Sequence, residues 1–252
     1  MKKLFTIFLL TVIVVNNFSC SKDSTSTGLP SVNSENDKQV GASANALLSA
    51  ATYTSVKIEI QYMPGFAPDA TAVSNLTAFF TSLINKPAGI TVVQTQIASP
   101  NKVVLSLTDI ATIEKSNRTV FTTGNQLGVY FLYTDGTYTD NSVLGLAFRN
   151  TSIAVLGKTA HDNSGAIGQV SRTKLESTVL EHEGGHILGL VDIGSPMQTN
   201  HKDAAHGNHC DNTSCLMYYS AETTDALGVL ITGAIPALDA NCKADLHANG
   251  GK

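Results

Sequence analysis

Two histidines and a glutamate in the segment 182–186, His-Glu-Gly-Gly-His, could together carry out metal chemistry. The segment fits H-E-x-x-H, and because positions i and i+4 of a helix share one face, both imidazoles can reach one metal ion. Glu183 would lie beside that ion, placed to take a proton from a water molecule that the ion activates. Gly189, three residues past His186, extends the match and favours a catalytic zinc site over two histidines that merely pack in the core.

The flanking sequence predicts the helix that would present these side chains. Four residues at helical spacing form one stripe: Leu175, Val179, His182 and His186. Thr173 and Glu176 fit a capping box at the start of the helix, and Gly189 fits an end signal.

A catalytic zinc needs a third protein ligand and one open position. The candidates downstream of Gly189 are Asp192, His201, His206 and His209. Asp192 holds the position that immediate spacing would give, and a carboxylate is an acceptable zinc ligand. On a polar loop, His201 and His206 could equally be solvated histidines.

The motif residues resemble the metzincin metalloproteases and are most similar to archaemetzincins, whose pattern is H-E-x-x-H-x-x-G-x-x-H-C-x-x-x-x-C-x-M. After Gly189, the matching residues are His209, Cys210, Cys215 and Met217. This chain departs from the pattern by seventeen extra residues, Val191–Gly207. Leishmanolysin-type metzincins also carry an insertion before their third histidine. The resemblance therefore favours His209 as the third ligand, with Asp192 as the main alternative.

The same resemblance implies an α/β (α+β), zincin-like fold: a twisted mixed sheet, an active-site helix and a C-terminal subdomain with a Met-turn. Met217 would form that turn beneath the ligands, although a methionine can also simply fill a gap in a core. Tyr219 would match a tyrosine that, in some metzincins, lies near the zinc and could stabilise the oxyanion.

Archaemetzincins hold a second, structural zinc with four cysteines. Cys210 and Cys215 match the first pair, but only Cys242 matches the second pair, because Asp245 stands where the fourth cysteine should be. Asp245 or His247 could complete such a site, since both are zinc ligand types. The alternative is a disulfide between two of the three cysteines.

The pattern of apolar residues supports a layered α/β arrangement independently of the motif. Strands are expected at 56–62, 90–97 and 126–133, and a pair of strands at 144–148 and 152–156. Helices are expected at 70–85, 109–117 and in the metal-site segment.

The N-terminus has the features of a targeting signal. Lys2 and Lys3 precede an apolar run, and residues 1–19 fit a lipoprotein signal peptide that ends before Cys20. Asn17 and Phe18 depart from the usual residues of such signals, so ordinary secretion is the alternative. Residues 20–46 are polar and predict a flexible tether that resembles those of Bacteroidetes surface lipoproteins, followed by a metallopeptidase domain over 47–252.

A chain of 252 residues with a net charge of −4 is long enough for one full core and gives no reason to expect nucleic acid as a partner. We expect a zinc-dependent endopeptidase, monomeric, held at the outer membrane by lipid on Cys20, on either its periplasmic or its outer side. The alternative is a non-catalytic surface binding lipoprotein that keeps zinc for stability. Peptide specificity is not readable from the sequence.

Overall fold

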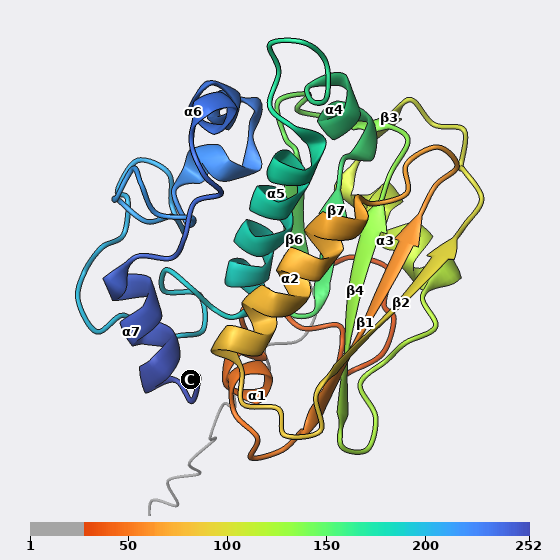
Figure 1. The fold of residues 1–252 in the computed structure, drawn as a ribbon. Coiled ribbons are helices and arrows are strands. Elements are labelled where there is room, and N and C mark those ends of the chain that lie inside the picture. The colour runs from red at the N-terminus through yellow and green to blue at the C-terminus, as the bar shows by residue number, and fades with distance from the viewer. Residues whose placement is uncertain (1–27) are drawn as a thin grey trace, which may run out of the picture.

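The computed structural model describes residues 28–252. Its centre is a five-stranded sheet in the order β2 (Ile90–Gln96), β1 (Ser55–Tyr62), β4 (Gln126–Tyr133), β7 (Ser152–Val155) and β6 (Gly145–Arg149). The first four strands are parallel, and β6 pairs antiparallel with β7 at one edge (Figure 1). The predicted α/β class with a mixed sheet is therefore confirmed.

Alternation along the two central strands sorts their side chains between two cores, because successive residues of a strand point to opposite faces. On β1, Ile58 and Ile60 join the larger apolar cluster, while Glu59 and Gln61 lie buried on the other face. On β4, Phe131 belongs to the larger cluster and its neighbours Tyr130 and Leu132 to the smaller one.

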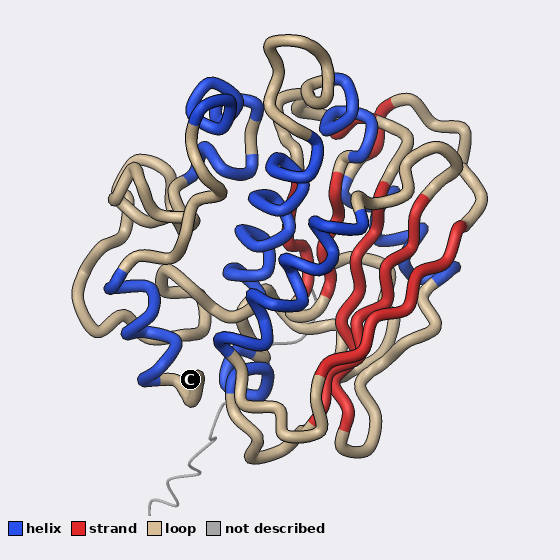
Figure 2. Tube along the Cα trace, in the orientation of Figure 1, coloured by secondary structure: helices blue, strands red, loops and turns tan. Residues whose placement is uncertain are grey.

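Helices cover both faces of the sheet (Figure 2). The larger core lies beneath α2 (Ala70–Leu83) and α5 (Arg172–Ile187), which pack against each other. The smaller core lies beneath α3 (Leu107–Asn117), whose Ser106 and Asp109 form a capping box. Two short helices, α1 (Ala44–Leu48) and α4 (Gly157–Asp162), and the strand pair β3 (Val104–Leu105) and β5 (Thr137–Tyr138) complete this part.

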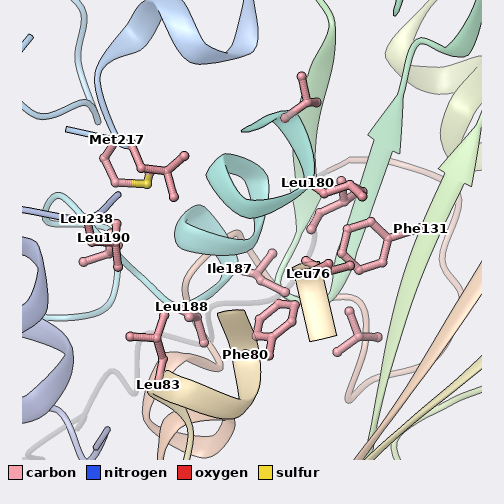
Figure 3. Packing of buried hydrophobic residues seen from close by; sticks show 14 of the residues in the cluster. Leu76, Phe80, Leu83, Phe131, Leu180, Ile187, Leu188, Leu190, Met217 and Leu238 are labelled. Carbon is pink, nitrogen blue, oxygen red and sulfur yellow. The ribbon is translucent and has the colours of Figure 1, made fainter. Parts of the chain in front are cut away.

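After α5 the chain forms a second region beside the sheet, drawn in blue in Figure 1. It contains η1 (Tyr219–Glu222), η2 (Thr224–Ala226), α6 (Leu227–Thr232) and α7 (Ala240–Ala248). Met217, Leu190 and Leu238 bury their side chains between this region and α5 (Figure 3), so both regions share one core.

The structure corrects the expected tether over residues 28–46. Asn36 is fully buried and donates hydrogen bonds to Thr122 Oγ1, Gly128 O and Thr151 Oγ1. Asp37 forms an ion pair with the buried Arg149. Polar composition suggested a solvated segment, but buried polar side chains fix it to the domain, together with Leu29, which packs against the smaller core. The expected signal peptide and Cys20 lie outside the described residues.

Within residues 28–252, no helix combines the length and the apolar character needed to cross a bilayer.

Candidate metal centre

Helix α5 presents the predicted stripe, although it begins differently from expectation. Its N-cap is Ser171, whose side chain accepts a hydrogen bond from Lys174 N, so the predicted capping box of Thr173 and Glu176 is wrong. Glu176 is instead buried and accepts hydrogen bonds from Asp69 N and Arg172 Nε. Because Asp69 is the N-cap of α2, the first of these bonds connects α5 to the start of α2. The expected end signal is confirmed, since Gly189 follows the helix at a φ of +80°.

Three imidazoles meet at one point beside α5. His182 and His186 extend from consecutive turns of the helix, with their Nε2 atoms 3.1 Å apart. His209 reaches the same point from beyond the insertion, and its ring stacks on that of His182 with 5.3 Å between centroids. One nitrogen from each ring and a carboxylate oxygen of Glu222 all lie within 4.8 Å of one another. The structure thus brings the three sequence-predicted ligand residues together.

Hydrogen bonds at the far side of two rings fix which nitrogen faces the cluster. His182 Nδ1 donates to Leu216 O at 2.7 Å, and His209 Nδ1 donates to His206 O at 2.7 Å. In a neutral imidazole the Nε2 atom is then an unprotonated acceptor, as a metal ligand must be. His209 Nε2 is buried and has no hydrogen-bond partner. Burial lowers the pKa of His186 to about 4, which also favours a neutral ring. The donor set therefore fits a zinc ion.

Glu183 lies next to this cluster between α5 and the edge strand β6. It is fully buried and has no side-chain hydrogen-bond partner, and only the backbone of Ala147 on β6 partly offsets the rise of its pKa. The side chain faces Gly145, the first residue of β6, where a Cβ atom would come within 3.1 Å of Glu183 Oε1. Burial, reinforced by the nearby charge of Glu222, raises the pKa of Glu183 well above its usual value. Such a buried and unpaired carboxylate favours proton uptake.

Glu222 is the member of the cluster that the sequence did not indicate. It ends η1, and its carboxylate oxygens lie 3.5–3.8 Å from the Nε2 atoms of His182, His186 and His209. The side chain remains 27% exposed. Burial alone would raise the pKa of Glu222, but hydrogen bonding to the three imidazoles holds this pKa below its usual range. No motif spacing marks this glutamate, because η1 is placed by contacts with the segment before β6.

The other candidate ligands lie elsewhere. Asp192, the main rival of His209, has a side chain that is 55% exposed and 3.7 Å from Lys202 Nζ, and its backbone has a φ of +68°. His206 stacks on Tyr219 with 3.6 Å between ring centroids, and its Nδ1 contacts Asp203. The interpretation of His201 as a solvated loop histidine is wrong, because it is 1% exposed.

His201 belongs to a second group of possible ligands, about the cysteines. His201, Cys210, Asp239 and Cys242 each offer one atom within 4.8 Å of the others. Cys215 Sγ lies 3.6 Å from Cys242 Sγ. Asp245, expected as a ligand, instead accepts a hydrogen bond from His201 Nε2 at 2.8 Å, and His247 is exposed on α7. The sequence did not indicate His201 as a ligand at this group, because nothing in its spacing shows that it lies next to Asp239 and Cys242, which come about forty residues later.

All three cysteines at or beside this second group are free in the structure, which therefore does not contain the disulfide that was the alternative to a second zinc. The contact with the Cys242 thiol lowers the pKa of Cys215 to about 7. Burial raises the pKa of Cys210 to about 12. Adjacent soft sulfur donors together with an imidazole are a zinc-type donor set.

Two hollows flank α5. One of about 480 Å³ is lined by Asn75, Phe79, Glu181 and Leu238 and includes none of the clustered histidines. The other, of about 300 Å³, lies between Thr178, Tyr218, Ala221 and Leu230. Two of its lining residues, Tyr218 and Ala221, belong to the segment between Met217 and Glu222.

The chain is similar to the archaemetzincin of Methanopyrus kandleri, with a TM-score of 0.47, 14% sequence identity, and coverage of 78% of this chain and 96% of that one. It is also similar to metalloproteinase-II of Bacteroides fragilis, with a TM-score of 0.42, 16% identity, and coverage of 79% and 54%. No family model and no curated protein matches the sequence.

Proposed function

We propose that this protein is a zinc-dependent endopeptidase. The observation that carries the proposal is the convergence of His182, His186 and His209 beside Glu183, a buried carboxylate that no cation and no other side chain neutralises. A site that only stabilised a fold would not need an unpaired carboxylate next to the metal, because burying one costs free energy. This feature favours catalysis over the alternative, a non-catalytic binding lipoprotein that keeps zinc for stability.

A zinc ion bound by the three histidines would polarise the scissile carbonyl and lower the pKa of a water molecule. Glu183 would accept the proton of the attacking water and deliver it to the leaving amine, acting as general base and then general acid. The raised pKa of Glu183 suits the second step, in which the carboxyl group has to be a proton donor. The hydrogen bonds to Leu216 O and His206 O keep two imidazoles oriented toward the ion throughout.

The edge strand β6 would hold the substrate. It pairs with β7 on one side only, so its other side offers backbone groups to an extended peptide. Gly145 brings β6 against α5 at Glu183, where a side chain on residue 145 would collide with Val179. A peptide added along this edge would therefore pass the general base, and one of its side chains could enter the hollow beside Tyr218.

The cysteine group would hold a second, structural zinc. His201, Cys210, Asp239 and Cys242 supply four donors within 4.8 Å of one another, which is a closed set for a structural site. Cys215 Sγ, 3.6 Å from Cys242 Sγ, lies beside this set and offers a further sulfur donor. Asp245 would orient His201, as carboxylates commonly do for zinc-bound imidazoles. Two zinc ions per chain, falling to one after replacement of Cys242 by serine, would support this site. One zinc per chain together with a mapped disulfide would exclude it.

We propose that this enzyme is located in the bacterial cell envelope, as an outer-membrane lipoprotein anchored through Cys20. The support is the sequence alone: two lysines, an apolar run and a cysteine preceded by a small residue. Mass spectrometry of the mature protein should find a lipid-modified N-terminal cysteine. An unmodified N-terminus at or beyond Cys20 would disprove the anchor.

Peptide hydrolysis by the zinc-loaded protein tests the catalytic proposal. We expect Glu183→Gln to lower turnover by about 10²–10⁴-fold, the usual contribution of general acid–base catalysis, while zinc stays bound. Glu35→Gln, at an exposed carboxylate, is the matched control and should leave turnover unchanged. Loss of cleavage on adding a chelator should be reversed by zinc. If the parent cleaves no peptide of a broad library, or if the Glu183 variant equals it, the binding lipoprotein becomes the better interpretation.

A further inference from the structure

The carboxylate of Glu222 occupies the side of the metal cluster that the three histidines leave open. Two ligands of a tetrahedral zinc, each about 2.0–2.2 Å from the ion, lie about 3.3 Å apart. The distances of 3.5–3.8 Å from Glu222 to the three Nε2 atoms are close to this separation, as is the 3.1 Å between His182 and His186. Four of the six separations are thus close to those of a tetrahedral ligand set, and all four residues offer ligand atoms within 4.8 Å of one another.

From this spacing we infer that Glu222 is a displaceable fourth ligand, which closes the metal centre in the resting protein. The inference rests on the proposed function and concerns how that same site is regulated. A zinc with four protein ligands is typical of structural sites, whereas catalytic sites keep one position open. Glu222 therefore has to leave its position before water and substrate can reach the ion.

The side chain of Glu222 is suited to such a departure. It comes from the last residue of η1, is 27% exposed, and has its only described polar contacts with the three histidines. The side chains of the histidines, in contrast, are at most 11% exposed, and two of them are fixed by hydrogen bonds to backbone carbonyls. The carboxylate can thus swing toward solvent while the imidazoles stay in place.

The backbone at Glu222 connects this position to the edge strand. Glu222 O accepts a hydrogen bond from Leu144 N at 2.8 Å, and Thr224 N donates to Ser142 O at 2.9 Å. Leu144 directly precedes Gly145, the first residue of β6. A peptide that pairs with β6 would therefore press on the segment that holds Glu222, so substrate binding and release of the carboxylate are coupled through residues 142–144.

Metal binding and access to the metal can be measured without turnover. We would titrate the full-length protein with zinc against a chromophoric chelator, and then follow the absorption of the cobalt(II) form as acetohydroxamate is added. Loss of one metal equivalent on replacing both His182 and His186 by alanine would identify the signal of this centre. The variants are Glu222→Ala and Glu222→Gln, with Asp225→Asn, an exposed carboxylate on the same segment, as the control.

Loss of Glu222 should weaken zinc binding by about 10–100-fold in both variants, no more than the loss of an outer hydrogen-bond partner does, because a water molecule can take the fourth position once this displaceable carboxylate is gone. Acetohydroxamate should bind their cobalt(II) forms at least about ten-fold more tightly than the parent, because no internal ligand competes with it. The Asp225 variant should match the parent. If the Glu222 variants also match the parent in both measurements, Glu222 is not a ligand. If the double histidine variant keeps all its metal, the proposed metal centre itself is wrong, and this inference fails with it.

Discussion

The sulfur atom of Met217 packs directly against the backbone of Gly185, in the last turn of the helix that carries both metal-site histidines. A Cβ atom on Gly185 would overlap this sulfur. The close contact joins the turn after His209 to the helix with His182 and His186 (Figure 3), so it fixes the third histidine relative to the first two.

Replacing Gly185 by alanine should therefore destabilise the protein. We expect a loss of about 1–3 kcal/mol from overpacking, which exceeds the gain of up to about 1 kcal/mol in helix propensity. Gly184→Ala is the matched control, because the nearest atom there is Phe80 Cζ, 3.2 Å away at the end of a side chain. Denaturant unfolding of the metal-free variants measures both. Equal stabilities would show that Met217 moves away without cost.

Asn36 should matter for stability although it lies in a segment of tether-like composition. Its side chain also accepts a hydrogen bond from Thr122 N, so Asn36→Ala would leave several buried polar groups unpaired. We expect a loss of about 2–4 kcal/mol, since each such group costs about 1–3 kcal/mol. Ser34→Ala, at an exposed position close by, should change little. If the thermal unfolding curves of the two variants coincide, residues 28–46 do not stabilise the domain and are better described as a linker.

These cases show which kinds of information the sequence contains. Local composition predicted every strand of the main sheet: alternation indicated β1, β-branched residues indicated β2, and a continuous apolar run indicated the fully buried β4. These signals lie within the strand itself and need no knowledge of its partners. The motif likewise predicted that His182, His186 and His209 meet. The sequence did not indicate the roles of Asn36 and Glu222, because both residues act through polar contacts of their side chains with residues distant in the chain. Nothing in their immediate neighbours distinguishes such residues from solvated ones.

The capping of α5 illustrates a related failure. Thr173 and Glu176 have the spacing of a capping box, but Ser171 lies two residues earlier and caps the helix instead. Glu176 then becomes available to accept the Asp69 amide at the start of α2. Local spacing allowed both starts of the helix, and a contact between two helices selected one of them.

Glu181 should make stability depend on pH. Burial beside the 480 Å³ hollow raises its pKa from 4.5 to about 7, so between these values the folded protein binds more protons at this site than the unfolded chain. The favourable contribution of the protonated form is present below about pH 4.5 and is lost as the pH rises through 7.

Glu181→Gln removes this ionisation. Its stability relative to the parent should therefore rise between pH 5 and pH 8, by no more than about 2 kcal/mol because the carboxylate is partly exposed to water. Urea unfolding at the two pH values provides the comparison, with Glu35→Gln as the control at an exposed carboxylate. A constant difference between parent and variant across this range would mean that Glu181 is not perturbed by its surroundings.

Zinc affinity should decide between the two sequence-level candidates for the third ligand. Loss of a direct ligand costs more than the about 10–100-fold that follows loss of an outer hydrogen-bond partner, so His209→Ala should weaken zinc binding by more than about 100-fold. Asp192→Ala should leave the affinity unchanged, because that side chain is 55% exposed and contacts Lys202 rather than the histidines. Chelator competition on both variants gives the two constants directly. An Asp192 variant that loses zinc while the His209 variant retains it would reverse the assignment and require the insertion to rearrange when metal binds.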